Sequence, residues 1–342
     1  MNIVFFSNKD PFRSTGGIQK HIRDLIGASE SHGLNATCIS ADNLPGIGTG
    51  NKRVCASSSI ERKLNKFCGS LTPIIVLQGS SSIFLYQTAS VCRGMGIRYF
   101  WTPHFHPFHT QKYPRLSELW FRMFEANLVK RSRKIFVLSE HEREVFKLLI
   151  GSVNNIEKIK NGVFFSTQSQ YDCDLTQNYL LFVGRDSPNK GLDLLIAQAG
   201  VAGEVGFDIV IVGVEGLRLK GLPPNVKCIG HPSDIELAKL YRRAAATIVP
   251  SRYEAFSYVA VESLSHGTPI VISENVMSKE YFQGKEYCWT VNFSREGRLR
   301  EVLSEIRALK NEQRRAIRYL SIDAAREFDL KNTTRDILSR LQ

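Results

Sequence analysis

One stretch, residues 249–273, constrains the fold of this chain more than any other, because its pattern is strand, loop, helix, turn and strand. Residues 246–249 are apolar and rich in strand-forming types, and a proline ends them. Ser257 is the residue type that caps the start of a helix, and Gly267 can take the left-handed conformation that ends one. Residues 270–272 predict a second buried strand. The segment is therefore expected to be one strand–helix–strand unit of an α/β sheet.

Two carboxylates stand out in this stretch, Glu254 in the loop and Glu262 inside the helix. The first turn of a helix offers unpaired backbone N–H groups and the positive end of a dipole, which suit a phosphate. A carboxylate before that turn and another within the helix suit hydroxyl groups on either side of the phosphate. This combination describes the binding of a nucleotide sugar. The alternative is an ordinary strand–helix–strand crossover with two solvated glutamates.

The stretch resembles the donor-binding segment of the retaining glycosyltransferases of family four, which have the GT-B fold. Their signature is Glu-x7-Glu with an aromatic residue soon after the first Glu, then a helix that ends in His/Ala-Gly-x-Pro. One departure is Ser257, where many relatives have Gly. In this chain the signature residues are Glu254, Phe256, Glu262, His266, Gly267 and Pro269.

The resemblance implies a role for each part of the stretch. Glu254 would hold hydroxyl groups of the transferred sugar, and Glu262 would hold the ribose. The intervening Ala255, Phe256 and Ser257 would complete the donor contacts at the start of the helix. Retaining enzymes of this fold lack a clear protein nucleophile, so the leaving phosphate is expected to take the acceptor proton.

A second motif, residues 184–191 with the sequence GRDSPNKG, lies between a predicted strand at 179–183 and a predicted helix at 192–199. Arg185 and Lys190 would project from a loop at the carboxyl end of a strand, where two cations can neutralise a departing diphosphate. The Gly-Arg…Lys-Gly pattern resembles that of family four. If these cations supply the positive charge, neither a metal nor another cofactor is expected. A solvated turn between strand and helix is the alternative.

The first half of the chain begins with a strand at residues 3–6 and a polar loop that ends in Gly16-Gly17 before a helix. These glycines allow close approach of a phosphate, although the pattern is not Gly-x-Gly-x2-Gly. Family-four enzymes have such a pair facing the cleft. They also often have a His that touches the donor sugar, and His104 matches it by position. His104, with His106 and His109, has no carboxylate or Cys nearby to complete a metal site.

Apolar segments alternate with polar or helical ones throughout the chain, which predicts parallel sheets covered on both faces. The fold class expected is α/β of the GT-B type, with two Rossmann-like domains facing a central cleft. The domains predicted are an acceptor-side domain at 1–165, a linker at 166–177, a nucleotide-sugar domain at 178–328 and a helix at 329–342 that returns to the first domain. In the first half we expect strands at 35–40, 74–77, 83–86, 97–102 and 135–139, and a helix at 115–134.

The charge is unevenly placed along the chain. Residues 1–165 carry 22 Lys/Arg and 11 Asp/Glu, whereas the rest carries 23 and 22, so the net +12 falls almost entirely on the first half. This asymmetry predicts an anionic partner, such as the inner membrane surface or a phospholipid-linked saccharide, and the alternative is a solubilising surface. No nucleic-acid-binding motif is present. The helix at 115–134 carries a basic end, which would meet lipid, and a predicted apolar stripe: Leu116, Trp120, Met123, Phe124, Asn127 and Leu128.

Seven cysteines without a Cys-x2-Cys pair predict reduced thiols in a cytoplasmic protein, with peripheral association at the inner face of the plasma membrane as a further expectation. The function expected is retaining transfer of a hexose-type sugar from a nucleotide diphosphate sugar to a lipid-linked saccharide, in lipopolysaccharide O-antigen or capsule assembly. The alternatives are a nucleotide-sugar epimerase or phosphorylase of the same fold, and a basic membrane-surface binding protein with a degenerate site.

Overall fold

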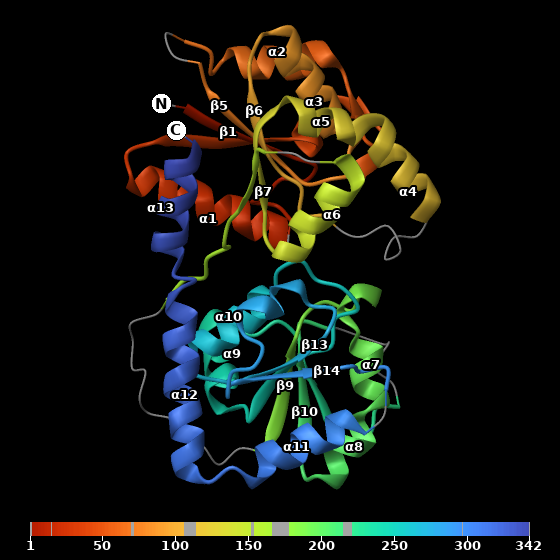
Figure 1. Ribbon diagram of the computed structural model, residues 1–342, viewed down its shortest axis with the longest axis vertical. Coiled ribbons are helices and arrows are strands. Elements are labelled where there is room, and N and C mark those ends of the chain that lie inside the picture. Colours follow the sequence, from red (N-terminus) through yellow and green to blue (C-terminus); the bar gives the residue numbers. More distant parts are fainter. Residues whose placement is uncertain are drawn as a thin grey trace. The chain divides into compact units, whose positions relative to one another are not determined.

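The computed structural model describes residues 2–14, 16–69, 72–105, 114–151, 154–165, 178–214, 221–295 and 297–341. The chain divides into two compact units, which Figure 1 shows with their labelled elements. Unit 1 is Met1–Gly162 with Leu330–Gln342, and unit 2 is Val163–Asp329. The sequence predicts these divisions at 165 and 329, and the predicted linker at 166–177 lies outside the described residues.

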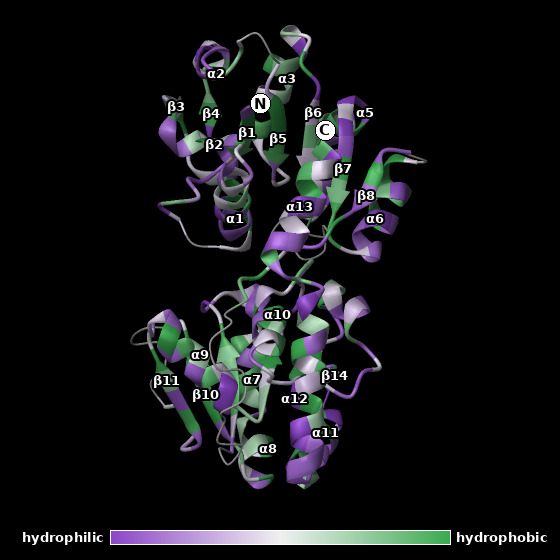
Figure 2. Cartoon of the chain, turned by 90° about the vertical axis from the view of Figure 1, so that its left-hand side faces the viewer, coloured by the Kyte–Doolittle hydropathy of each residue, from purple (hydrophilic) through white to green (hydrophobic). Residues whose placement is uncertain are grey.

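Unit 1 is built on a six-stranded sheet in the order β2-β1-β5-β6-β7-β8, and every neighbouring pair is parallel. Figure 2 shows β1 and β5 as mostly hydrophobic, as expected for strands that are covered on both faces. The predicted parallel sheet is confirmed. The strands are β1 Asn2–Ser7, β2 Asn35–Ser40, β5 Ile74–Gln78, β6 Tyr99–Thr102, β7 Ser132–Val137 and β8 Ile156–Lys158, with a short antiparallel pair of β3 Gly46–Ile47 and β4 Val54–Cys55.

Helices separate these strands along the chain. The last helix, α13, packs against α1, although the two lie at opposite ends of the sequence (Figure 1). Gly162 allows this return, because a Cβ there would lie 2.6 Å from the Leu330 Cα. The helices of unit 1 are α1 Gly17–Ser31, α2 Ser57–Asn65, α3 Ile83–Gly94, α4 Pro114–Trp120, α5 Ala126–Arg131, α6 Glu140–Ile150 and α13 Leu330–Leu341.

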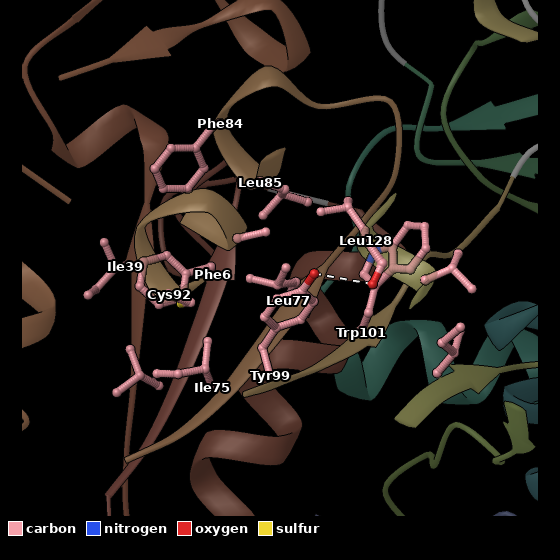
Figure 3. Close-up of a cluster of buried hydrophobic side chains, with 14 of the residues drawn as sticks. Phe6, Ile39, Ile75, Leu77, Phe84, Leu85, Cys92, Tyr99, Trp101 and Leu128 are labelled. Carbon is pink, nitrogen blue, oxygen red and sulfur yellow. Dashed lines mark hydrogen bonds between the residues drawn. The ribbon is translucent and has the colours of Figure 1, made fainter. Parts of the chain in front are cut away.

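One hydrophobic cluster of unit 1 lies between the sheet and the helices on one of its faces. Figure 3 shows Phe6, Leu77 and Trp101 from three neighbouring strands among these side chains. The Tyr99 hydroxyl donates a hydrogen bond of 3.1 Å to the Leu128 carbonyl, so this buried polar group has a partner (Figure 3). This polar atom of β6 is therefore satisfied within the core.

The predicted strand at 83–86 is wrong, because these residues begin helix α3. The Ser82 side chain accepts a hydrogen bond of 3.1 Å from the Leu85 backbone N–H and caps the helix. Phe84, Thr88 and Cys92 are buried at four-residue spacing, which is the period of a helix. The uncharged run at 67–92 therefore contains one strand and one helix. Among the described residues, no helix has both the length and the apolar character needed to cross a membrane.

The helix predicted at 115–134 is found over most of that range, but it is not regular throughout and it ends at Arg131. It is divided into α4, a π-helical turn at Phe121–Glu125 and α5, and β7 begins at Ser132. The wider π turn shifts the helical register, so the predicted apolar stripe is only partly buried. The buried residues after α4 are Phe121, Glu125, Leu128 and Val129, whereas Leu116 and Met123 are 64% and 54% exposed.

Unit 2 has a second six-stranded parallel sheet in the order β11-β10-β9-β12-β13-β14. Its strands are β9 Tyr179–Val183, β10 Asp208–Val212, β11 Val226–Ile229, β12 Ala246–Val249, β13 Ile270–Ser273 and β14 Cys288–Val291. Its helices are α7 Leu192–Ala197, α8 Ala199–Glu204, α9 Asp234–Arg243, α10 Tyr258–Ser265, α11 Arg298–Ala308 and α12 Asn311–Arg326. The predicted strands at 179–183 and 246–249 match β9 and β12 in full.

One buried carboxylate in unit 1 connects the ends of two strands. Glu142 on α6 accepts hydrogen bonds from the Phe105 N–H at 2.8 Å and the Leu138 N–H at 2.7 Å. Burial raises the pKa of Glu142 from 4.5 to about 7, even though both hydrogen bonds lower it. The folded chain therefore keeps this proton to higher pH than the unfolded chain does. The stability from the neutral form is present below about pH 4.5 and is lost as the pH rises to about 7.

We therefore expect the melting temperature of the native protein to fall relative to that of Glu142→Gln as the pH rises through this window. Glutamine keeps the shape of the neutral carboxyl group and does not ionise. Thermal unfolding at several pH values measures this difference, and Glu144→Gln, an exposed position on the same helix, is the matched control. A difference that changes in the opposite direction would show that the hydrogen bonds outweigh burial.

Candidate functional site

Two loops lie side by side in unit 2, because β9 and β12 are neighbours in a parallel sheet and both loops leave their carboxyl ends. The β9 loop is residues 184–191, and the β12 loop is residues 250–257. The Arg252 backbone N–H donates to the Asn189 carbonyl at 2.8 Å. The Arg252 guanidinium also donates to both carboxylate oxygens of Asp193, at 2.7 and 2.6 Å. The fold thus brings together two motifs about 65 residues apart in the sequence.

An ion pair connects the functional side chains of the two loops. The Lys190 Nζ lies 2.6 Å from the Glu254 Oε1, and their side chains are 27% and 15% exposed. Ser251 donates to the other Glu254 oxygen at 3.0 Å. The backbone of Glu254 is bonded on both sides, with its N–H donating to Asn275 and its carbonyl accepting from Met277. Glu254 is therefore held rigidly, and it positions the Lys190 ammonium group.

Gly191 allows the two loops to approach closely. Its φ is +65°, and a Cβ there would lie 2.1 Å from the Pro250 carbonyl oxygen. Any side chain at this position would push the β9 loop away from the β12 loop. The glycine in the Lys-Gly motif is thus required by geometry.

Helix α10 begins at the end of the β12 loop with the predicted cap. The Ser257 Oγ accepts from the Ala260 N–H at 3.3 Å, and the Ser257 N–H donates to the Ser278 Oγ at 3.1 Å. The Phe256 ring is 6% exposed and packs against Tyr258 and Phe328, with centroids 5.4 and 5.9 Å away. Any donor contact by Phe256, or by the equally buried Ala255, therefore comes from the backbone.

Glu262 lies on α10, and its carboxylate is positioned by a residue that the sequence does not reveal. The Tyr241 hydroxyl donates to the Glu262 Oε2 at 3.2 Å. Burial raises the pKa of Tyr241 well above its ordinary value, so the hydroxyl keeps its proton and remains a donor. The Tyr241 ring also stacks on His266 at the end of α10, with centroids 5.4 Å apart.

Arg185 is the second residue of the β9 loop and is exposed. It forms no ion pair with any described carboxylate, in contrast to Lys190. The two cations of the motif therefore differ: one is positioned by a carboxylate, and the other is available to solvent and ligand.

The remaining predicted site residues, Gly16, Gly17 and His104, belong to unit 1. Gly16 precedes α1, and Gly17 is the first residue of that helix. His104 is only 7% exposed, and its Nε2 lies 2.9 Å from the Gln78 Oε1. The His21 and His104 rings pack edge to face, with their centroids 5.4 Å apart. Burial lowers the pKa of His21 to about 4.

His106 and His109, considered as metal ligands, lie outside the described residues. Within the part of the chain that the structure describes, no three His, Cys, Asp or Glu side chains gather in a group that could hold a metal ion.

Comparison with known proteins places this geometry in a family. The family model described as "Glycosyl transferases group 1" matches residues 165–320, which include both loops and α10. The second unit is a member of the glycosyl transferases group 1. This confirms the family-four resemblance predicted from the motifs.

Similar proteins agree with this placement. The GDP-mannose:cellobiosyl-diphosphopolyprenol alpha-mannosyltransferase of Xanthomonas campestris is 25% identical over 179 residues, which cover 49% of this chain and 47% of that protein. The chain thus spans about half the length of the curated relatives it matches first. Sucrose-phosphate synthase of Thermosynechococcus elongatus is structurally similar, with a TM-score of 0.77, 17% identity and coverage of 99% of this chain and 97% of that one.

A further structural neighbour is WaaG, a glycosyltransferase involved in lipopolysaccharide biosynthesis. It has a TM-score of 0.70, 14% identity and coverage of 99% of this chain and 100% of that one. These structural likenesses show the GT-B fold, with two Rossmann-like units, as the sequence predicts.

The stability of the glycosyl transferase unit should depend on the absence of a side chain at Gly191. Gly191→Ala should lower its stability by about 1–3 kcal/mol, because a positive φ and a clash with the Pro250 carbonyl act together. Gly221→Ala is the matched control, since Gly221 has φ +82° but no atom within 4 Å of a Cβ. Denaturant unfolding of both variants isolates the clash, and equal losses would contradict this account of the loops.

Proposed function

We propose that this protein is a retaining hexosyltransferase that moves a sugar from a nucleotide diphosphate sugar to a hydroxyl group of a lipid-linked saccharide. The observation that carries the proposal is the Lys190–Glu254 pair, held between two loops at the beginning of α10. A cation and a carboxylate at one point suit a ligand with a phosphate next to sugar hydroxyls. The family of unit 2 supports this interpretation.

In this proposal, the chain stabilises the leaving group by charge. The Lys190 ammonium and the Arg185 guanidinium neutralise the diphosphate as its bond to the sugar breaks, and the first turn of α10 adds N–H donors. Lys190 exchanges part of its contact with Glu254 for the phosphate, which leaves the Glu254 carboxylate to accept from sugar hydroxyl groups. Because these cations supply the charge, the proposal requires no metal. The leaving phosphate takes the acceptor proton, and attack on the same face retains the anomeric configuration.

Glu262 has a separate role in the proposal. It lies about one turn into α10. Tyr241 donates to one oxygen of its carboxylate, and this carboxylate is proposed to accept from the ribose hydroxyls. The buried His104 of unit 1 is proposed to contact the donor sugar, and Gly16-Gly17 to lie near its phosphates. These assignments rest on the family pattern.

Removing the diphosphate cations should abolish most of the transfer. Lys190→Ala and Arg185→Ala should each lower the turnover rate by roughly 10²-fold or more, as loss of transition-state charge stabilisation does. Release of nucleotide diphosphate from a panel of nucleotide sugars measures this and also identifies the donor. Lys227→Ala is the control, because Lys227 also pairs with a carboxylate at 2.7 Å but lies on edge strand β11. Near-native rates in both loop variants would contradict the proposal.

The acceptor proposed is a lipid-linked saccharide at the inner face of the plasma membrane, in O-antigen or capsule assembly. The name of the Xanthomonas relative includes a cellobiosyl-diphosphopolyprenol, and WaaG is involved in lipopolysaccharide biosynthesis. The basic surplus of the first half fits an anionic bilayer. Such a protein would be cytoplasmic and bind the membrane peripherally.

We propose that unit 1 meets lipid through the surface around α4 and the end of α5. In Figure 1, α4 projects from the side of unit 1, and it carries exposed Leu116 and Leu119, followed by exposed Met123. These three recur at near-helical spacing and can enter the interface between headgroups and acyl chains. Lys130 and Arg131 are exposed at the end of α5. Two further basic residues at the end of the helix predicted at 115–134 already have partners: Arg133 lies over the Phe100 ring, and Lys134 pairs with Glu157.

Binding of the protein to anionic vesicles should therefore depend on the exposed Lys130 and Arg131. Each basic residue near an anionic surface contributes about 1 kcal/mol, so Lys130→Glu with Arg131→Glu should weaken binding at least tenfold. Flotation with phosphatidylglycerol vesicles measures this, and added salt should abolish binding because charges are screened within about 8–10 Å. Lys285→Glu with Arg295→Glu, two exposed positions in unit 2, is the control. Absence of binding at low salt would favour a soluble acceptor.

A further inference from the structure

Four arginines of unit 2 line one small pocket outside the site described above. Arg242 and Arg243 end α9, Arg314 and Arg318 lie on α12, and the turn after α10 completes the lining with Gly267. We call these four residues the arginine cluster. No carboxylate lines the pocket.

The arginine cluster lies at the amino ends of the strands, whereas Lys190 and Glu254 lie at the carboxyl ends. The pocket is lined by Ala245, directly before β12, and by Pro269, directly before β13. Lys190 and Glu254 instead follow the carboxyl ends of β9 and β12. A four-residue strand separates the two edges by about 13 Å. The pocket is therefore not part of the proposed donor site.

The charge of the cluster is not balanced by the chain. No described carboxylate forms an ion pair with Arg242, Arg243 or Arg314. Elsewhere in unit 2, arginines do have acidic partners, such as Asp193 for Arg252, Glu301 for Arg298 and Glu204 for Arg300. The positive charge of the cluster also acts on the neighbouring His266. Burial lowers the pKa of His266 to about 4, and the charges of Arg242 and Arg318 lower it further.

Two members of the cluster are held in place by backbone carbonyl groups. Arg314 donates to the carbonyls of Leu309 and Ile306 at the end of α11, at 3.0 and 2.9 Å. Arg318 donates to the His266 carbonyl at the end of α10, at 3.0 Å. These bonds fix the two guanidinium groups and so reduce the entropy that a ligand would otherwise have to remove.

The other two members keep donors for a ligand. The Arg242 side chain donates through its Nε to the Ala238 carbonyl at 3.2 Å, which leaves both terminal nitrogens for a ligand. Arg243 is exposed and forms no ion pair with a described carboxylate. Guanidinium groups recognise phosphate oxygens through paired N–H donors, and several converging on one pocket give an anion site.

We propose that the arginine cluster binds a phosphate-bearing anion at the edge of unit 2 away from the donor. The ligand class is a phosphate ester or diphosphate, either free in solution or as a lipid headgroup. The bound anion would neutralise charge that α9 and α12 bring together at the end of α10. Binding should therefore raise the melting temperature of unit 2.

The test must separate this pocket from the donor site, which would also bind phosphate. Calorimetric titration with inorganic pyrophosphate at constant ionic strength is therefore done on the full chain carrying Arg185→Ala and Lys190→Ala. We expect binding in this background, and at least tenfold weaker binding when Arg242→Gln and Arg243→Gln are added. These two changes leave Arg314 and Arg318, which hold helix ends, in place. The matched control is Arg298→Gln with Arg300→Gln, an equal change of charge on α11.

A second arm identifies the source of the phosphate. Flotation with phosphatidylglycerol vesicles is done on the chain carrying Lys130→Glu and Arg131→Glu, which removes the proposed lipid surface of unit 1. Loss of pyrophosphate binding alone in Arg242→Gln with Arg243→Gln assigns a soluble ligand, and loss of vesicle binding as well assigns a headgroup. The proposal is overturned if neither probe binds, or if the α11 control weakens binding as much as the cluster variant. Circular dichroism melts of each variant confirm that it is folded.

Discussion

The ion pair between Lys190 and Glu254 is the contact on which the rest of unit 2 depends. It joins loops from two neighbouring strands, and such a partly buried pair contributes only if its geometry is fixed. Gly191 brings the backbones together, Arg252 connects the loops through Asp193, and the bridge to Val276 fixes Glu254 from the β13 side. Each of these contacts therefore helps to hold the Lys190 ammonium group in place.

Helix α10 extends from this ion pair and is fixed at both ends. Ser257 and Ser278 hold its start. At its end, Gly267 takes φ +77°, and a Cβ there would lie 2.5 Å from the Arg318 side chain, which donates to the His266 carbonyl. The Gly-x-Pro of the signature thus ends the helix and also admits an arginine from α12. Because α10 is only eight residues long, about 12 Å, fixing its end also limits movement at its beginning.

The sequence predicts most of unit 2 because its signals are local. Capping residues, apolar runs and the order of the two motifs are enough to place β9, β12 and α10. Tyr241 could not be predicted, because its bond to Glu262 depends on how α9 packs beside α10. The burial of the Phe256 ring likewise depends on Phe328, which is 72 residues away in sequence. The candidate donor residues were predicted by motif, whereas the residues that position them come from tertiary contacts.

Unit 1 was predicted less well for two different reasons. Helix α3 has the apolar composition of a strand, and only the Ser82 cap and four-residue burial spacing identify it. The π turn at Phe121–Glu125 has no signal that hydrophobic periodicity can detect. Its consequence is chemical, since Glu125 is turned inward and is buried.

Two buried glutamates of unit 1, Glu125 and Glu142, each accept a hydrogen bond at or next to a strained backbone position. Ser81 and His104 have φ of +54° and +47°, which are costly for residues with a Cβ, by roughly 1–3 kcal/mol each. The Ser81 N–H donates to Glu125, and the N–H of Phe105, next to His104, donates to Glu142. Both strained positions follow neighbouring strands, β5 and β6, at the carboxyl edge of the sheet. These carboxyl groups are costly to bury, but each accepts a backbone N–H at or next to a strained residue. They therefore help to hold the backbone in the conformation that presents His104 to Gln78.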